Sequence, residues 1–259
     1  MAAAMMPSRA DGEARVDHEF DRIGAAAAGY RRLKRDIIQG EFAPGEKLLM
    51  NTLKARYGLG VGPLREALSQ LVAERLVVAI SQRGYRVAGM SREELEDVYD
   101  ARAQLEAKVV QLAIERGDDE WESRVVAAAY SLGKVVETTS GTETLELWDT
   151  RHKAFHDAIA EGCGSPALLQ ARSFLADLAE RYRFQWLRAT VMSAQALELK
   201  REEHDALTSA LLERDAERAS GLIYTHLMTP VAIIADLLGL VPSISQSQVG
   251  RDGGARQRN

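Results

Sequence analysis

The chain lacks the features that stabilise small secreted proteins or anchor proteins in membranes. It contains a single cysteine, Cys163, so it cannot form an internal disulfide, and a reducing cytoplasm is the expected setting. No apolar run reaches the roughly 18 residues that a membrane-spanning helix needs. The opening residues, MAAAMMPSRADGE, lack the basic start and the apolar core of a secretory signal. We therefore expect a cytoplasmic protein with no membrane as partner.

Proline and aromatic residues are scarce too. Six prolines and an aromatic fraction of 6% in 259 residues fit a mainly helical protein better than a barrel or a sandwich. Common enzyme signatures are also missing: nothing resembles a phosphate-binding loop, a dinucleotide-binding glycine fingerprint or a nucleophile elbow. These absences disfavour the corresponding enzyme classes.

The charge that is present is unevenly distributed. Residues 30–90 hold 11 Lys and Arg against 5 Asp and Glu, whereas residues 91–242 hold 16 against 27. The overall net charge of −5 conceals this division. A basic module joined to an acidic one indicates that only the first meets a polyanion, although ordinary surface variation is an equal alternative on charge alone.

The basic module has the pattern of a winged helix. An amphipathic helix in YRRLKRDIIQGEF is followed by a short helix with Leu53 and Tyr57 on its inner side, a glycine-rich turn, and a helix in PLREALSQLVAERL. Two short apolar runs, VVAI and YRVAGM, then predict a hairpin with a basic loop. Helix, helix, turn, helix and hairpin is the order of elements in this fold.

The residues of this module resemble the DNA-binding domain of the GntR family. The resemblance rests on IIQGEFAPGEKL, LKARYG, PLREALSQLVAERLV and QRGYRV, which together span about 60 residues. It implies that the helix near Pro63 enters the major groove and that the hairpin tip contacts the minor groove or its phosphates. Helix N-terminal amides favour phosphate, and arginine offers two parallel donors to a guanine edge. The implied DNA-contacting residues are Val61, Gly62, Pro63, Arg65, Arg83 and Gly84.

One position departs from the family pattern. Where the family usually has Ser or Thr, then Arg and Thr, before the proline, this chain has Gly60-Val61-Gly62. Val61 therefore occupies the position where family members often have an arginine that contacts bases. Val61 is expected to pack on a thymine methyl instead. Arg65 matches the arginine of the family's P-x-R-E motif. The alternatives are a solvated charge or salt bridge for Arg65 and a mobile loop charge for Arg83.

From Ser91 onward the pattern becomes that of an all-α bundle. Ser91 and Glu94 form a capping box, and about six helix-like segments follow without a strand signal. Four of the five histidines lie here. His152 and His156 are four residues apart on one helix, so both rings project from one face and can share a metal ion at about 2.0–2.2 Å. A histidine on a helix is usually an ordinary core or surface residue, and on spacing alone that alternative stays open.

The helical half resembles the FCD ligand-binding domain, which follows this winged helix in the FadR-like branch of the family. The resemblance rests on R-x-x-L-E (102–106), H-x-x-x-H followed by AIAEGCGSP, R-Y-R (181–183), and E-H-x-x-L followed by a later histidine. His152 stands where the family most often has Asp, so the ion would keep its full 2+ charge and favour an anionic effector. Zn²⁺ is the expected ion, with Ni²⁺ and Mn²⁺ as alternatives. The implied ligands are His152, His156, His204 and His226.

The same resemblance implies a cationic clamp for a small carboxylate effector. Arg102 matches the arginine that faces the cavity in the family, and a guanidinium binds a carboxylate through two parallel hydrogen bonds. Arg181 and Arg183 are further candidates, although arginines two apart on a helix cannot both face inward. Surface salt bridges are the alternative for all three. Trp148, Tyr182 and Trp186 are candidate cavity residues or plain core.

Together these features predict a metabolite-responsive repressor of organic-acid catabolism genes, a homodimer that binds a palindromic operator and releases it when the effector binds. A metal-dependent hydrolase-like enzyme is one alternative, but no glutamate base stands between His152 and His156. A ligand-free dimerising scaffold is the other. The predicted organisation is a disordered tail (1–29), a winged helix (30–90), an all-helical effector-binding and dimerisation domain (91–241) and a second disordered tail (242–259).

Overall fold

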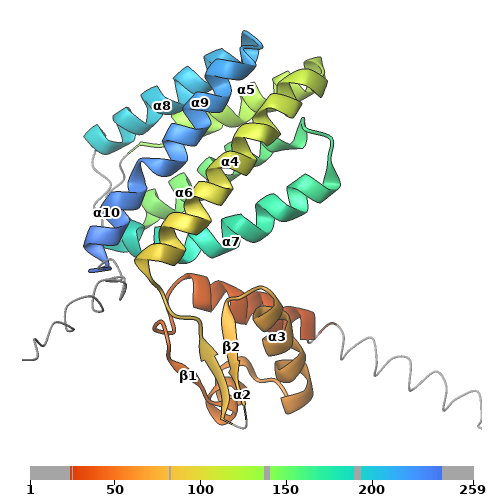
Figure 1. The fold of residues 1–259 in the computed structure, drawn as a ribbon, viewed down its shortest axis with the longest axis vertical. Coiled ribbons are helices and arrows are strands. Elements are labelled where there is room, and N and C mark those ends of the chain that lie inside the picture. The colour runs from red at the N-terminus through yellow and green to blue at the C-terminus, as the bar shows by residue number, and fades with distance from the viewer. Residues whose placement is uncertain (1–23, 25, 82, 137–140, 190–193, 241–259) are drawn as a thin grey trace, which may run out of the picture.

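The computed structural model describes residues 24, 26–81, 83–136, 141–189 and 194–240 (Figure 1). The chain is mainly helical, with one small sheet near its start, as the composition predicted. Of the expected tails, residues 1–23, 25 and 242–259 lie outside the described residues. The first helix covers residues 26–38, so residues 26–29 are helical and the expected boundary at residue 29 lies too far along the chain.

The N-terminal part is a winged helix. After the first helix come β1 (Lys47–Leu48), α2 (Met50–Tyr57), α3 (Val61–Ala73), β2 (Val77–Ile80) and β3 (Gly84–Val87). Strand β3 lies between β1 and β2 and runs antiparallel to both, which confirms the predicted hairpin. The sequence analysis missed β1, because a two-residue strand is too short to show the alternation that marks a strand.

Helix α3 begins earlier than the glycine-rich stretch suggested. Its first residue is Val61, so Gly62 is helical and Pro63 lies inside the first turn. The N-cap residue is Gly60, which has no side chain to accept a hydrogen bond from the first amides. Gly58 ends α2 with φ +67°, a left-handed conformation that glycine adopts without steric cost.

Seven helices follow in the described part of the chain, one more than expected. Ser91 caps the first of them by accepting a hydrogen bond from the amide of Glu94, as predicted. The extra helix arises at Pro230, which has no amide hydrogen and divides the expected last helix. The helices are α4 (Arg92–Arg116), α5 (Asp119–Gly133), α6 (Gly141–Glu161), α7 (Pro166–Ala189), α8 (Ala194–Leu212), α9 (Ala216–Met228) and α10 (Pro230–Leu237).

The stretch Ala216–Leu237, which spans α9 and α10, is long and apolar enough by length and composition to cross a membrane. In this structure its inner side chains belong to the protein core. Ile223 packs in the bundle, and Val231 and Ile234 pack beside α4 and α7. In the most apolar 18-residue window of this stretch 33% is buried, and length and composition alone are weak evidence of a membrane span.

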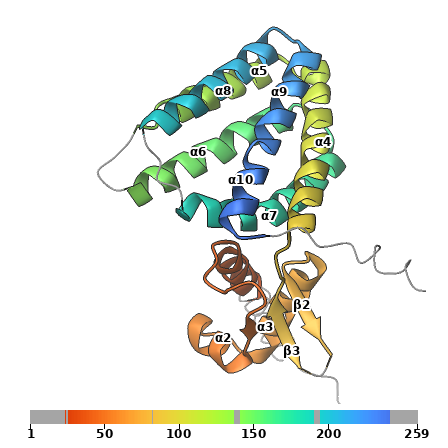
Figure 2. The ribbon, with the colours of Figure 1, turned by 60° about the vertical axis from the view of Figure 1, so that its left-hand side comes forward.

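Two clusters of buried apolar side chains hold the molecule together, and one of them contains residues of both modules. One cluster lies within the bundle and includes Trp121 and Phe155. The other runs from the winged helix into the bundle, because Leu33 of the first helix and Leu68 of α3 belong to the same cluster as Leu178 of α7. Figure 2 shows the first helix directly below α7 and α10. The winged helix and the bundle thus share one core.

Candidate metal and effector site

Four histidines from three helices meet inside the bundle, three of them buried and the fourth, His226, half-buried. His152 and His156 stand one turn apart on α6, His204 comes from α8 and His226 from α9. The Nε2 atoms of His156 and His152 are 3.1 Å apart, and those of His152 and His226 are 3.4 Å apart. One potential ligand atom from each of the four lies within 4.8 Å of the others. The structure thus brings together all four histidines that the sequence singled out.

These separations fit a shared cation. Two nitrogen ligands at about 2.1 Å from one ion lie about 3.0 Å apart at a right angle and about 3.4 Å apart at the tetrahedral angle. The Nε2 atom of His204 is buried and has no hydrogen-bond partner among the described residues. A buried polar atom without a partner is costly, and a bound cation would remove that cost.

A carboxylate behind the cluster orients one of its rings. Nδ1 of His226 lies 2.8 Å from Oε2 of Glu203. A carboxylate at this distance favours the proton on Nδ1 and leaves the lone pair of Nε2 directed at the other histidines. Although burial raises the pKa of Glu203, hydrogen bonds from His226 and Lys200 lower it to about 2, so this carboxylate is ionised.

The imidazoles are neutral at pH 7. Burial, with repulsion between neighbouring rings, holds the pKa of His152 and His156 well below the usual 6.5. The same causes lower the pKa of His204 to about 3. Burial also lowers the pKa of His226, against the opposing hydrogen bond to Glu203. Neutral imidazole is the form that binds metal ions.

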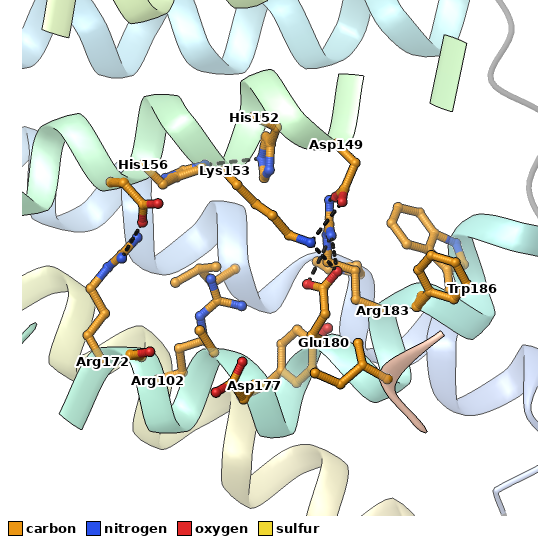
Figure 3. Close-up of a pocket in the computed structure, with 18 of the residues that line it drawn as sticks. Arg102, Asp149, His152, Lys153, His156, Arg172, Asp177, Glu180, Arg183 and Trp186 are labelled. Carbon is orange, nitrogen blue, oxygen red and sulfur yellow. Dashed lines mark hydrogen bonds and ion pairs between the residues drawn. The ribbon is translucent and has the colours of Figure 1, made fainter. Parts of the chain in front are cut away.

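A cavity of about 570 Å³ opens beside the histidines (Figure 3). His152, His156 and His226 line it. Its volume lies in the range of small-molecule sites. Five cationic side chains from four helices of the bundle also line it: Arg102 of α4, Lys153 of α6, Arg172 and Arg183 of α7, and Lys200 of α8.

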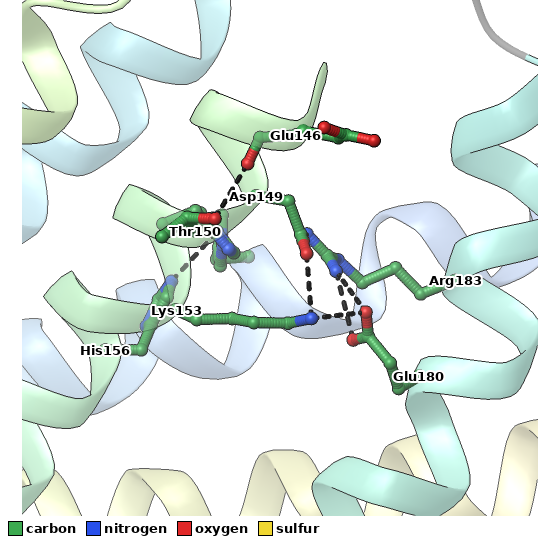
Figure 4. Close-up of polar contacts among 9 residues, drawn as sticks. Glu146, Asp149, Thr150, Lys153, His156, Glu180 and Arg183 are labelled. Atoms are coloured by element: carbon green, nitrogen blue, oxygen red, sulfur yellow. Dashed lines mark hydrogen bonds and ion pairs between the residues drawn. The ribbon is translucent and has the colours of Figure 1, made fainter. Parts of the chain in front are cut away.

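Most of these cations have carboxylate partners. Arg183 forms ion pairs with Asp149 at 2.5 Å and with Glu180 at 2.8 Å. Lys153 contacts the same two carboxylates, each at 2.8 Å, which closes a four-membered network (Figure 4). Arg183 and Glu180 are each 9% exposed, whereas the side chain of Lys153 is 48% exposed, so the network meets solvent at Lys153. Its charges largely cancel.

Arg102 is the least neutralised cation of the bundle in this cavity. The nearest carboxylate oxygen, on Glu106, lies 3.7 Å from Nε of Arg102, beyond hydrogen-bond distance. That nitrogen is buried and has no hydrogen-bond partner within the described residues. Glu106 instead accepts a hydrogen bond from Arg172 at 2.9 Å. Arg102 therefore retains donors for an anionic ligand.

Arg181 lies elsewhere, which corrects its assignment to the effector site. Its guanidinium donates hydrogen bonds to the carbonyl oxygens of Ala88, at 2.9 Å, and Gly89, at 2.7 Å. Two residues advance a helix by about 200°, so Arg183 faces the cavity while Arg181 faces the linker between β3 and α4. Tyr182 is not among the cavity residues either, whereas Trp148 and Trp186 line the cavity.

Sequence reasoning missed Arg172, Lys153 and Glu203. A signal for Arg172 was present, because it precedes Arg183 by 11 residues, or about three helical turns, and therefore shares its face. Lys153 stands between the two histidines of α6, where its sequence position alone does not mark it as a cavity residue. Glu203 adjoins His204 in sequence, but it acts on His226, and only the packing of α8 on α9 reveals that contact.

The residues expected to meet DNA lie on the surface of the winged helix. Val61, Gly62 and Arg65 are exposed at the start of α3, and Pro63 is half-buried. Arg83 and Gly84 are exposed at the hairpin, where Gly84 has φ +89°. None of the six belongs to a buried core cluster. Their contact with DNA remains a prediction.

Known protein families match both parts of the chain. Residues 26–87 match the family described as bacterial regulatory proteins, gntR family, and residues 97–229 match the FCD domain. The HTH-type transcriptional repressor GlaR of Escherichia coli (strain K12) is 59% identical over 206 residues, which cover 80% of this chain and 94% of GlaR. The HTH-type transcriptional regulator BphR of Paraburkholderia xenovorans (strain LB400) is 35% identical over 209 residues, which cover 80% of this chain and 84% of BphR.

Solved structures share the architecture. Escherichia coli McbR/YncC has a TM-score of 0.68 at 20% identity, over 83% of this chain and 98% of that one. A transcriptional regulator GntR from Rhodococcus sp. RHA1 has a TM-score of 0.61 at 23% identity, over 84% and 99%. At these identities the likeness shows a common fold.

Proposed function

Because the chain belongs to the GntR family of transcription regulators and carries an FCD domain, it is a regulator rather than an enzyme, and we propose that it represses organic-acid catabolism genes until a carboxylate effector binds. The observation that carries this proposal is the cluster of four neutral histidines beside a cavity with a partly unpaired arginine. An acidic ligand fits such a site because both the ion and the arginine attract it.

A divalent ion at the histidine cluster is the anchor of the effector in this proposal. His152, His156, His204 and His226 would hold it, with Zn²⁺ as the expected ion and Ni²⁺ and Mn²⁺ as alternatives. Four neutral ligands leave the ion its 2+ charge, which a carboxylate oxygen can partly neutralise. Arg102 is the matching clamp within the bundle, and Arg183, already paired with carboxylates, helps to shape the wall.

Residues 30–90 bind the operator in this proposal, and residues 91–241 bind the effector and form the homodimer. Helix α3 enters the major groove with Val61, Gly62, Pro63 and Arg65, while Arg83 and Gly84 reach the adjoining backbone. One winged helix makes few phosphate contacts, so a two-fold dimer on a palindrome is needed for tight binding. Such a regulator works in the cytoplasm.

The test begins with purified full-length protein. Metal analysis should find one divalent ion per chain, and selection from random duplexes should return a palindrome. In a thermal-shift screen of small carboxylates, an effector at 100 times its Kd should add about 2.7 kcal/mol of stability. That effector should weaken operator binding by roughly 5- to 150-fold, the usual range of allosteric coupling.

Paired variants assign the roles. His204→Ala with His226→Ala should lose the metal and the effector response but keep operator binding without effector. Arg102→Ala should keep the metal and lose affinity for the acid. If the double histidine variant still releases DNA on adding the same acid, the ion does not mediate the response. Failure of the protein to select any DNA sequence would contradict the regulator function itself.

A further inference from the structure

The wall of the effector cavity is not built from the bundle alone. Four residues of the first helix of the winged helix, and the residue that directly follows this helix, also line the cavity beside the histidines. Their positions follow the pattern i, i+3, i+4, i+7 and i+8, which places them along one helical face. These residues are Arg31, Lys34, Arg35, Ile38 and Gln39.

The first helix is held against the bundle by apolar and ionic contacts. Leu33 and Ile37 are buried in the core cluster that also contains Leu178 of α7. Nζ of Lys34 lies 2.6 Å from a carboxylate oxygen of Asp177 on α7 and 2.9 Å from one of Glu74 at the end of α3. Figure 3 shows Asp177 on the same side of the cavity as Arg102. The position of this wall is therefore defined by both modules.

This wall carries positive charge with few partners. Lys34 is already paired with two carboxylates. Arg31, in contrast, is exposed and has no hydrogen bond or ion pair with any residue that the structure describes. The side chain of Arg35 is 62% exposed, and its one carboxylate neighbour, Asp36, lies 3.7 Å away. Two arginines at the cavity thus keep donors for an acidic group.

We propose that the first helix of the DNA-binding module is part of the effector site and that Arg31 and Arg35 bind a second acidic group of the effector. The inference rests on the proposed function, because it takes the histidine cluster as the site of the first carboxylate. One ligand would then contact both modules of a single protomer. The cavity volume of about 570 Å³ leaves room for such a ligand beyond the atoms that reach the histidines.

The shared site gives the effector a direct means of acting on DNA binding. A ligand shifts a conformational equilibrium only through contacts that differ between the two states. Contacts with Arg31 and Arg35 depend on where the first helix lies relative to the bundle. Leu33 of that helix packs in the same core as Leu64 and Leu68 of α3, so a change in its position is transmitted to the helix that is expected to enter the groove.

The test measures effector binding by calorimetry on metal-loaded full-length protein without DNA, so that contacts between arginine and phosphate play no part. The probes are straight-chain α,ω-dicarboxylic acids of four to eight carbons and monocarboxylic acids of the same lengths. At least one diacid should bind about tenfold more tightly than its matched monoacid, since a charge-assisted hydrogen bond contributes about 1.5–3 kcal/mol. Arg31→Ala with Arg35→Ala should abolish this preference and leave monoacid binding unchanged.

Arg32→Ala is the matched control, because Arg32 is an exposed arginine on the same helix that does not line the cavity. It should leave both affinities unchanged. A diacid preference that survives the double variant, or no diacid preference in the wild type, would overturn the inference while leaving the proposed function standing. If no carboxylate binds the metal-loaded protein, both the inference and the proposed effector class fail.

Discussion

At the scale of single residues, Glu203 fixes the position of the proton on His226. Removing this carboxylate frees the ring to adopt the other tautomer or to rotate, both of which misdirect the lone pair. We expect Glu203→Ala to weaken metal affinity about 10- to 100-fold, as loss of a carboxylate behind a histidine ligand typically does. Competition with a chelating dye would measure it.

The control for this variant is Glu202→Ala, since Glu202 is the exposed neighbour on the same helix. It removes the same charge from α8 without touching His226. Equal metal affinities in the two variants would show that Glu203 acts only through general electrostatics, and would contradict its positioning role.

Tyr99 gives a second prediction at this scale. It lines the cavity, is 2% exposed, and its hydroxyl has no hydrogen-bond partner among the described residues. Burial raises the pKa of Tyr99 to about 12, so the hydroxyl keeps its proton and can donate. An unpaired buried hydroxyl costs about 1–3 kcal/mol, so Tyr99→Phe should leave the effector-free protein at least as stable. If the hydroxyl donates to the effector, affinity should fall by about fivefold.

For Tyr99→Phe, thermal unfolding would measure the change in stability and calorimetry the change in effector affinity. Tyr224→Phe is the control, because Tyr224 is exposed and its hydroxyl already donates to Asp100 at 2.9 Å. Unchanged effector affinity in Tyr99→Phe would mean that the hydroxyl takes no part in recognition.

At the scale of elements, α3 presents its N-terminal turn to solvent. Arg65 is exposed there, beyond the glycine N-cap whose neighbouring amides lack a side-chain acceptor. We expect Arg65→Ala to cost about 1–3 kcal/mol of operator binding, or about 5- to 150-fold, without affecting folding. Gln70→Ala is the control, because Gln70 is exposed five residues further along α3. Wild-type affinity in a folded Arg65→Ala protein would refute this docking of α3.

The elements that the sequence predicted were those with local causes. The hairpin and α3 follow from short apolar runs, glycines and helical spacing, and α4 from its Ser91 cap. Strand β1 depends on pairing with distant β3, and no pattern of its own reveals it. The break at Pro230 was readable but was overlooked because apolar residues continue on both sides of it.

The same distinction holds for the site. His152 and His156 share a helix, so spacing alone placed them together, whereas His204 and His226 could be added only through a family resemblance. The contribution of the first helix to the cavity could not be predicted, because Arg31 and His152 are distant in the chain and meet only through the packing of the two modules.

At the scale of the whole molecule, the four clustered histidines make stability depend on pH. Each has a folded-state pKa below the value near 6.5 of the unfolded chain. The unfolded chain therefore takes up protons first as pH falls. The stability that the neutral histidines contribute is fully present above about pH 6.5 and decreases as the pH falls below that value. For His204 this decrease continues down to about pH 3. Between pH 7.5 and 5.5 we expect a loss of roughly 1 kcal/mol for each histidine that stays neutral.

Urea unfolding of metal-free protein at the two pH values would measure this loss. The variant His204→Ala with His226→Ala should show a shallower dependence, because two of the groups are gone. If the free energy of unfolding falls equally between the two pH values in the variant and the wild type, other groups dominate the acid response.

The shared core limits how this regulator can be recombined with others. The chain passes from winged helix to bundle near residue 90, but Leu33 and Ile37 on one side of that point pack with Leu178 and Tyr182 on the other. A chimera joined there would set a foreign first helix against these side chains and against Asp177, the partner of Lys34. A functional chimera must therefore keep the packing side chains of both modules together, and during evolutionary divergence these positions should covary as pairs.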